Sequence, residues 1–168
     1  MIKHGARITL REVTTAALFL DRDGTLSEEV GYVNHPSRLR VLRRAAEAVP
    51  RLNQAAVPAV LVTNQSGIAR GYFSADVLSL VNASLIDQLS VEGAHLAALY
   101  MCSHHPREGE PPYRLECDCR KPKPGMLLKA ASDLGLAQRR VFRAPAPPAQ
   151  SVPWGEVRKG GEAPLRVP

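Results

Sequence analysis

Two aspartates separated by one residue stand directly after a short apolar run near the start of the chain. Asp21 and Asp23 lie in the segment DRDGTL, which follows the run AALFL. One carboxylate of such a pair can act as a nucleophile and metal ligand, while the other acts as a general acid and then as a base. The alternative is an acidic turn that only closes a strand, because Asp and Gly are ordinary turn residues.

Two further segments could bind phosphoryl groups. TNQSG begins at Thr63 after a second apolar run, and its hydroxyl, amides and glycine turn suit hydrogen bonds to phosphoryl oxygens. RKPKPG begins at Arg120 just before a predicted helix, where Lys121 could neutralise one phosphoryl group and Arg120 could grip a second. A polar turn and a solvated basic turn are the respective alternatives.

The three cysteines and one histidine form a further group. Cys102-x-His104 and Cys117-x-Cys119 offer three thiolates and one imidazole, the closed donor set of a structural zinc site. Every cysteine takes part, which favours a metal site in a reducing compartment over a disulfide scaffold. His105 could replace His104 as the fourth ligand, and free cysteines in a loop are the simpler alternative.

Short strands must place these groups at one edge of a sheet. Apolar runs without alternation predict parallel strands covered on both faces, and three such runs occur, at Ala16–Leu20, Val57–Thr63 and Leu96–Cys102. Helical patterns lie between and after them. The order predicts an α/β fold, a Rossmann-like parallel sheet with helices on both faces and a zinc-binding loop.

Local signals set the limits of the three predicted helices. The first has apolar positions from Leu39 to Leu52, and Pro50 should kink or break it. The second is capped by Ser74 and stopped by Gly93. The third is opened by Pro124 and ended by Gly135.

The two ends of the chain differ from the domain predicted at 16–142. Residues 1–15 are polar and basic, which predicts a flexible lead and not a secretory signal. A further strand begins at Val141 and Phe142, but prolines and glycines interrupt any regular element in the tail at 143–168. The C-terminal strands are therefore expected to be missing or disrupted, as in a GC-rich gene translated out of frame.

The composition narrows the range of partners. The net charge of +6 is spread along the chain and aromatic residues make up 5%, so we expect no nucleic-acid partner. No apolar run approaches the roughly 20 residues of a membrane helix, so we expect no membrane partner. The 168 residues suit one cytoplasmic domain, expected to be a monomer that acts on a small molecule.

Taken in order, DxDGT, TNQSG and RKPKPG resemble the motifs of the haloacid dehalogenase-like phosphatases. Within that superfamily, FLDRDGTL, GYV at 31–33, VTNQSGIARGYFS at 62–74 and CDCRKPKPGML at 117–127 are similar to the heptose-bisphosphate phosphatase family. The resemblance spans residues 16 to 135. Histidinol-phosphate phosphatases share the aspartates and the metal loop, but they usually lack the GYV and IARGYF segments.

The resemblance implies a magnesium-dependent phosphatase that removes the 7-phosphate of D-glycero-D-manno-heptose 1,7-bisphosphate through an aspartyl-phosphate. Asp21 would be the nucleophile and Asp23 the acid and base, with Mg²⁺ bound at both, while Thr63 and Lys121 would stabilise the phosphoryl oxygens. Zn²⁺ would be bound by Cys102, His104, Cys117 and Cys119. Substrate contacts are implied for Arg22, Glu29, Val30, Gly31, Tyr32, Asn64, Gln65, Ser66 and Arg120.

The chain departs from this family pattern after the strand at Val141. Family members have a GD followed by a further Asp there, which completes the Mg²⁺ shell, whereas this chain has RAPAPP and no acidic residue before Glu156. We therefore expect weaker magnesium binding and a lower rate. Asp118 and Glu156 are the carboxylates to inspect as substitutes. A phosphatase for histidinol phosphate or another sugar phosphate, and a non-catalytic family member, are the alternatives.

Overall fold

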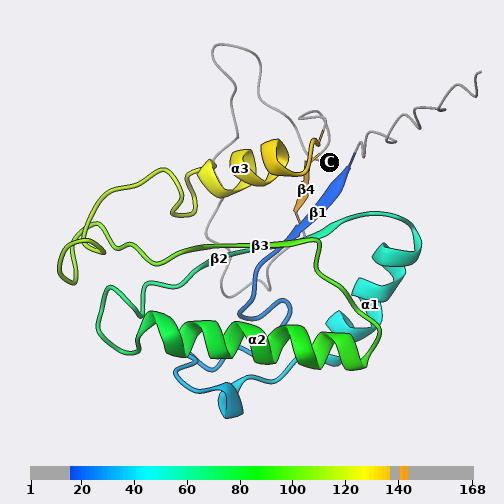
Figure 1. The fold of residues 1–168 in the computed structure, drawn as a ribbon, viewed down its shortest axis with the longest axis horizontal. Coiled ribbons are helices and arrows are strands. Elements are labelled where there is room, and N and C mark those ends of the chain that lie inside the picture. The colour runs from blue at the N-terminus through cyan, green and yellow to red at the C-terminus, as the bar shows by residue number, and fades with distance from the viewer. Residues whose placement is uncertain (1–15, 137–140, 144–168) are drawn as a thin grey trace, which may run out of the picture.

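The computed structural model describes residues 16–136 and 141–143, and four parallel strands form its single sheet. The strand order is β3-β2-β1-β4 (Figure 1). The strands are β1 at Ala17–Leu20, β2 at Ala59–Asn64, β3 at Ala98–Cys102 and β4 at Val141–Arg143. In the central pair, Leu18 of β1 is in register with Ala59 of β2. The three strands predicted from apolar runs are confirmed, each within a few residues of its expected limits.

Helices cover both faces of the sheet (Figure 1). Successive strand residues point to opposite faces, so each strand contributes to two cores. Leu20 and Leu61 belong to the core that contains residues of helices α1 (Arg43–Gln54) and α2 (Ala75–Val91). Phe19 and Val60 belong to the core formed with helix α3 (Gly125–Asp133). The predicted Rossmann-like α/β class is confirmed.

The limits of α2 follow from local chemistry. The Ser74 hydroxyl accepts a hydrogen bond from the backbone N–H of Val77 at 3.2 Å, which satisfies one free donor of the first turn. At the other end, Gly93 has φ +71°, a left-handed conformation that favours glycine. Both predicted signals are confirmed, and they fix where the chain enters and leaves the longest helix among the described residues.

The first predicted helix was wrong at its start, and it is not broken at Pro50. Leu39 does not begin it: the residue is extended, at φ −78° and ψ 130°, and follows a short 3₁₀ helix, η1, at Pro36–Arg38. The fully buried Leu39 reaches the core from this loop, which explains why it continued the helical spacing. Pro50 does not break the helix either, because α1 runs through it to Gln54. Burial of Ala45 and Val49 against the sheet outweighs the one lost backbone hydrogen bond.

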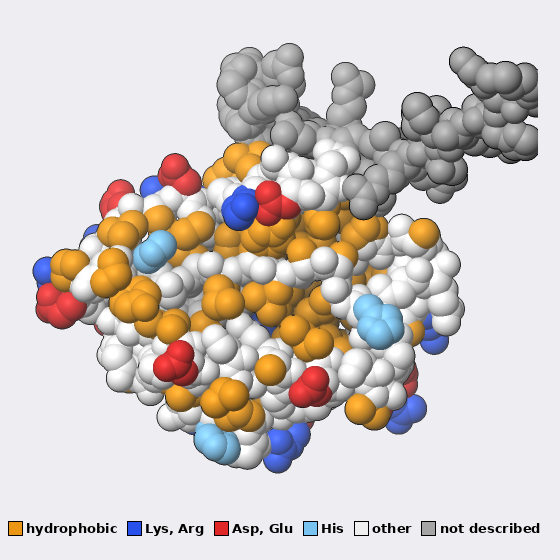
Figure 2. Space-filling view, in the orientation of Figure 1, with side chains coloured by type: hydrophobic (Ala, Val, Ile, Leu, Met, Phe, Trp, Pro, Cys, Tyr) orange, Lys and Arg blue, Asp and Glu red, His pale blue; other side chains and the backbone are white. Residues whose placement is uncertain are grey.

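Strand β3 is one of the two edge strands of the sheet, and apolar side chains gather on the face of the molecule shown in Figure 2. Met101 of this strand is 40% exposed. A separate apolar cavity of about 380 Å³ lies between β1 and α1, with Leu18, Leu20 and Val49 in its lining. None of the predicted catalytic side chains lines this cavity, so it does not mark the candidate site.

Two predictions fall outside the described residues. These are the flexible lead at 1–15 and the irregular tail beyond Arg143. Within the described part of the chain, no helix has both the length and the apolar character needed to cross a membrane.

Packing of α2 on the sheet yields a test of the fold. Leu85 is fully buried and Leu80, on the same helix, is 59% exposed. Leu85→Ala should lower the free energy of unfolding by about 2–5 kcal/mol because it leaves a cavity in the core. Leu80→Ala should change it by less than about 0.5 kcal/mol. Urea unfolding measures both values, and equal losses would contradict this packing.

Candidate active site and metal cluster

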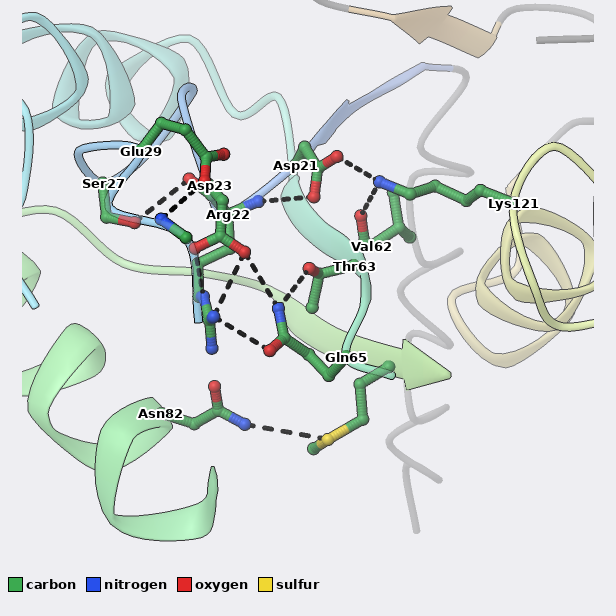
Figure 3. Close-up of polar contacts among 12 residues, drawn as sticks. Asp21, Arg22, Asp23, Ser27, Glu29, Val62, Thr63, Gln65, Asn82 and Lys121 are labelled. Carbon is green, nitrogen blue, oxygen red and sulfur yellow. Dashed lines mark hydrogen bonds and ion pairs between the residues drawn. The ribbon is translucent and has the colours of Figure 1, made fainter. Parts of the chain in front are cut away.

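Asp21 meets Lys121 at the carboxyl ends of the central strands (Figure 3). Asp21 directly follows β1, and its Oδ2 atom forms an ion pair with the Nζ atom of Lys121. Lys121 Nζ also donates to the carbonyl oxygen of Val62 in β2 at 3.0 Å. The other carboxylate oxygen of Asp21 accepts the backbone N–H of Arg22 at 2.8 Å. The Asp21 side chain is still 42% exposed, so a ligand can reach it from solvent.

Asn64 holds the backbone of Lys121 in place. Its amide nitrogen donates to the Lys121 carbonyl oxygen at 3.1 Å, and its amide oxygen accepts the Lys121 N–H at 3.0 Å. This reciprocal pair joins the end of β2 to the loop before α3, so the side-chain amide acts like one further step of a backbone ladder. Sequence reasoning placed Asn64 near the sugar, and the amide contacts described here are with protein.

Asp23 faces away from Lys121 toward two buried side chains. Its carboxylate accepts from Arg22 Nε at 2.9 Å, from Arg22 Nη2 at 3.1 Å and from Gln65 Nε2 at 3.0 Å. Gln65 Nε2 also donates to the Thr63 hydroxyl at 3.0 Å, and its amide oxygen accepts from Arg22 Nη2 at 2.9 Å. One network therefore connects the second aspartate to the hydroxyl at the end of β2 (Figure 3).

The residues predicted to bind substrate fall into two groups. Arg22, Gln65 and Ser66 form the buried group, at 1%, 4% and 9% exposed. The side chains of Arg22 and Gln65 contact Asp23 from the protein interior. The loop from 29 to 32 is exposed, and within it the Glu29 carboxylate accepts the N–H of Gly31 at 3.0 Å. The substrate roles of both groups stay predictions.

Sequence reasoning missed the residue that fixes this exposed loop. Arg38 donates from Nη1 to the Tyr32 carbonyl oxygen at 3.1 Å and from Nη2 to the Val30 carbonyl oxygen at 3.3 Å. The Tyr32 ring lies 4.6 Å from the Tyr72 ring between centroids. No motif marks Arg38, but the GYF part of the IARGYF segment signals the aromatic contact.

The four predicted metal ligands lie together. One donor atom from each residue lies within 4.8 Å of the other three. The Sγ atom of Cys119 is 3.1 Å from that of Cys102 and 3.2 Å from that of Cys117, while His104 Nδ1 is 3.4 Å from Cys119 Sγ. Tetrahedral Zn–S bonds of about 2.3 Å place sulfur atoms roughly 3.8 Å apart, so the three sulfur atoms lie somewhat closer together than around a bound zinc ion and would move apart slightly to hold one. Burial raises the pKa of the Cys102 thiol, and a bound dication would offset that effect.

The histidine alternative is also decided by position. His104 is in the cluster, whereas His105 Nδ1 accepts the backbone N–H groups of Arg107 and Glu108 at 3.3 and 2.9 Å. His105 Nε2 lies 3.1 Å from Arg70 Nη2. Arg120, which directly follows Cys119, donates to the His104 carbonyl oxygen at 3.0 Å. This bond ties the predicted anion-binding side chain to the metal loop.

The oxygen ligands available near Asp21 fit a magnesium ion that keeps several waters. The exposed carboxylate is a hard ligand of the kind Mg²⁺ prefers. Among the described residues, only the Cys/His cluster brings three or more Cys, His, Asp or Glu side chains close enough to share a metal ion. No third carboxylate therefore joins Asp21 and Asp23 within this part of the chain. Asp118 instead pairs with Lys123 at 3.7 Å, and Glu156 lies outside the described residues.

Known proteins resemble this chain over most of its described length. It is 46% identical over 126 residues to D-glycero-beta-D-manno-heptose-1,7-bisphosphate 7-phosphatase of Pasteurella multocida, covering 75% of this chain and 68% of that protein. It is 44% identical over 120 residues to the protein of the same name from Haemophilus influenzae, covering 71% of this chain and 65% of that one. The chain thus spans about two thirds of the length of these relatives. No protein-family model matches it.

Two solved structures share the fold. A HAD-like phosphatase of Mesorhizobium loti superposes with a TM-score of 0.73 at 35% identity, over 83% of this chain and 67% of the other. D,D-heptose 1,7-bisphosphate phosphatase of B. bronchiseptica, complexed with magnesium and phosphate, gives a TM-score of 0.62 at 34% identity, over 72% of this chain and 64% of the other. The magnesium and phosphate belong to that relative.

The Asn64 bridge leads to a prediction with an internal control. Asn53 makes the same reciprocal pair with the backbone of His95, at 2.9 and 2.8 Å, far along the chain from the site residues. If either amide is changed to a carboxylate, the N–H donor to the backbone carbonyl oxygen is lost. A negatively charged oxygen then lies against that carbonyl oxygen. Asn64→Asp and Asn53→Asp should each lower the free energy of unfolding by about 1–3 kcal/mol. Only Asn64→Asp should weaken binding of inorganic phosphate, followed as protection against thermal unfolding. A weaker site in both variants would contradict the bridge.

Proposed function

The chain belongs to the D-glycero-beta-D-manno-heptose-1,7-bisphosphate 7-phosphatase family, and from this membership we propose that it hydrolyses the 7-phosphate of that heptose bisphosphate. The observation that carries the proposal is the contact of an exposed carboxylate, Asp21, with the ammonium of Lys121 beside Asp23 and Thr63. A nucleophile, a cation and an acid–base group at one strand edge are the parts that phosphoryl transfer requires.

The reaction proceeds in two displacements at phosphorus. In the first, an Asp21 oxygen forms a bond to the 7-phosphorus as the bond to the sugar oxygen breaks, and Asp23 gives that oxygen a proton. In the second, Asp23 takes a proton from water, whose oxygen bonds to phosphorus and releases Asp21 and orthophosphate. Together the two displacements return the proton to Asp23 and the free carboxylate to Asp21, so the enzyme is regenerated.

Two side chains stabilise the phosphoryl oxygens during both steps. Lys121 provides an ammonium beside the nucleophile, and Thr63 provides a hydroxyl at the end of β2. Asp21 and the Asp23 backbone carbonyl would hold Mg²⁺, which when bound draws charge from the phosphoryl oxygens. Arg120, fixed to His104, would bind the 1-phosphate end, while Glu29, Val30, Gly31 and Tyr32 would face the sugar.

The Cys/His cluster would serve as a structural zinc site. Four ligands leave no open position for water, so its contribution is to the loop and not to the chemistry. Cys119 is directly followed by Arg120 and Lys121. Metal binding there would fix the loop that delivers both cations to the phosphoryl groups.

Phosphatase activity should depend on Asp21 and should be higher on the heptose bisphosphate than on histidinol phosphate. The protein should release phosphate from the heptose 1,7-bisphosphate with Mg²⁺, and Asp21→Asn should lower kcat by about three orders of magnitude or more. Colorimetric phosphate release measures both, with histidinol phosphate tested beside it. The rate should stay well below that of the Pasteurella multocida relative, because no third carboxylate joins the site within the described residues. Faster release from histidinol phosphate, or none from either substrate, would overturn the proposal.

Adjacent histidines make a matched pair for testing the metal site. His104→Ala should lose about one bound zinc per chain and melt at a lower temperature, because one of four ligands is removed. His105→Ala should keep the metal, since that ring binds backbone groups of its own loop. Elemental analysis of the purified proteins measures the zinc content of both variants, and thermal unfolding measures their melting temperatures. Equal zinc content in the two variants, or none in the unmodified protein, would refute the site.

A further inference from the structure

Gln65 is the most completely bonded polar side chain at the site. It is 4% exposed, and both N–H groups of its amide are used, one to Asp23 Oδ2 and one to Thr63 Oγ1. Its amide oxygen accepts from Arg22 Nη2, and its backbone N–H donates to the Cys102 carbonyl oxygen at 2.7 Å. An amide has two donor hydrogens, so neither is left to donate to a sugar hydroxyl.

The partners fix which way the amide faces. A guanidinium can only donate hydrogen bonds. The oxygen of Gln65 must therefore face Arg22, and its nitrogen must face Asp23. Arg22 grips the same Asp23 carboxylate with Nε and Nη2, so the two buried side chains hold it from adjacent directions (Figure 3).

The bond to Thr63 orients a second group. Because Gln65 Nε2 donates to the Thr63 oxygen, one lone pair of that oxygen is occupied and the hydroxyl proton is left to point elsewhere. A hydroxyl held in this way is a donor toward a phosphoryl oxygen at the end of β2. One amide thus sets the direction of the acid–base carboxylate and of the phosphoryl-binding hydroxyl.

We propose that Gln65 is a positioning residue for the hydrolysis: its amide aligns Asp23 for proton transfer and Thr63 for phosphoryl contact, and it does not bind the sugar. The inference rests on the proposed function and adds to it a residue that works through two others. It replaces the substrate contact that sequence reasoning assigned to Gln65.

Leaving-group dependence distinguishes this role from a structural one. A sugar oxygen needs a proton as it leaves, whereas p-nitrophenolate leaves without one. The ratio kcat/KM reports the steps up to departure of the leaving group. Gln65→Met should lower kcat/KM by about 100-fold on the heptose bisphosphate, the size of an acid–base contribution, and by less than about tenfold on p-nitrophenyl phosphate. In an Asp21→Asn background, Gln65→Met should leave the Kd of the heptose bisphosphate within about threefold.

Two further variants control for folding. Gln88, a partly buried glutamine of α2, also makes several hydrogen bonds: its amide oxygen accepts from Val41 N–H, and its amide nitrogen donates to the Leu39 carbonyl oxygen and to the Ser84 hydroxyl. Gln88→Met should keep kcat/KM near that of the unmodified protein on both substrates. Gln65→Glu keeps the size of the side chain and the bond to Arg22 but loses the donor to Asp23, so it should fold and lose at least as much activity as Gln65→Met.

Each outcome decides the inference. Equal losses on the two substrates, a higher Kd for the sugar, or an active Gln65→Glu would overturn it while leaving the proposed function standing. An unmodified protein that hydrolyses neither substrate would overturn the proposed function and this inference with it.

Discussion

The ion pair between Asp21 and Lys121 is the contact on which the arrangement of the site depends. Its two members are 100 positions apart in the chain, and the Lys121 side chain is only 9% exposed. A charge so far removed from water is costly unless it is paired and hydrogen-bonded. Asp21 and the Val62 carbonyl oxygen supply those partners, and Asn64 holds the backbone beneath. The sheet, the metal loop and the start of α3 are thereby brought to one point.

The second aspartate shows how one short motif serves two purposes. Asp21 faces Lys121 and solvent, while Asp23 faces Arg22 and Gln65. Arg22 between them is 1% exposed, so the motif carries its own buried counter-charge. We infer that this division lets the first carboxylate react while the second is kept in a fixed orientation. Cys119, the last residue of the Cys/His cluster, lies two residues before Lys121 in the chain, so a bound metal would restrain the same ion pair from the other side.

The sequence predicted the sheet and α2 well because their signals are local. Uninterrupted apolar runs marked the three strands, and Ser74 and Gly93 marked the ends of α2. The metal quartet was also predicted, since the spacing of Cys and His residues is visible in the chain. Side-chain direction was harder to predict. Whether Asn64 or Gln65 faces substrate or protein depends on partners that the fold brings from distant segments. Leu39 was misjudged, and α1 is not broken at Pro50, for a related reason: burial in the core can override local helix rules.

The central claim is that the Asp21 carboxylate accepts the phosphoryl group. Trapping measures this directly: the protein is mixed with heptose 1,7-bisphosphate and Mg²⁺, quenched, and reduced with borohydride, which converts an acyl phosphate to an alcohol. Peptide mass spectrometry should then find homoserine at position 21 and unchanged aspartate at 23. Homoserine at position 23, or at neither position while phosphate is being released, would contradict the account.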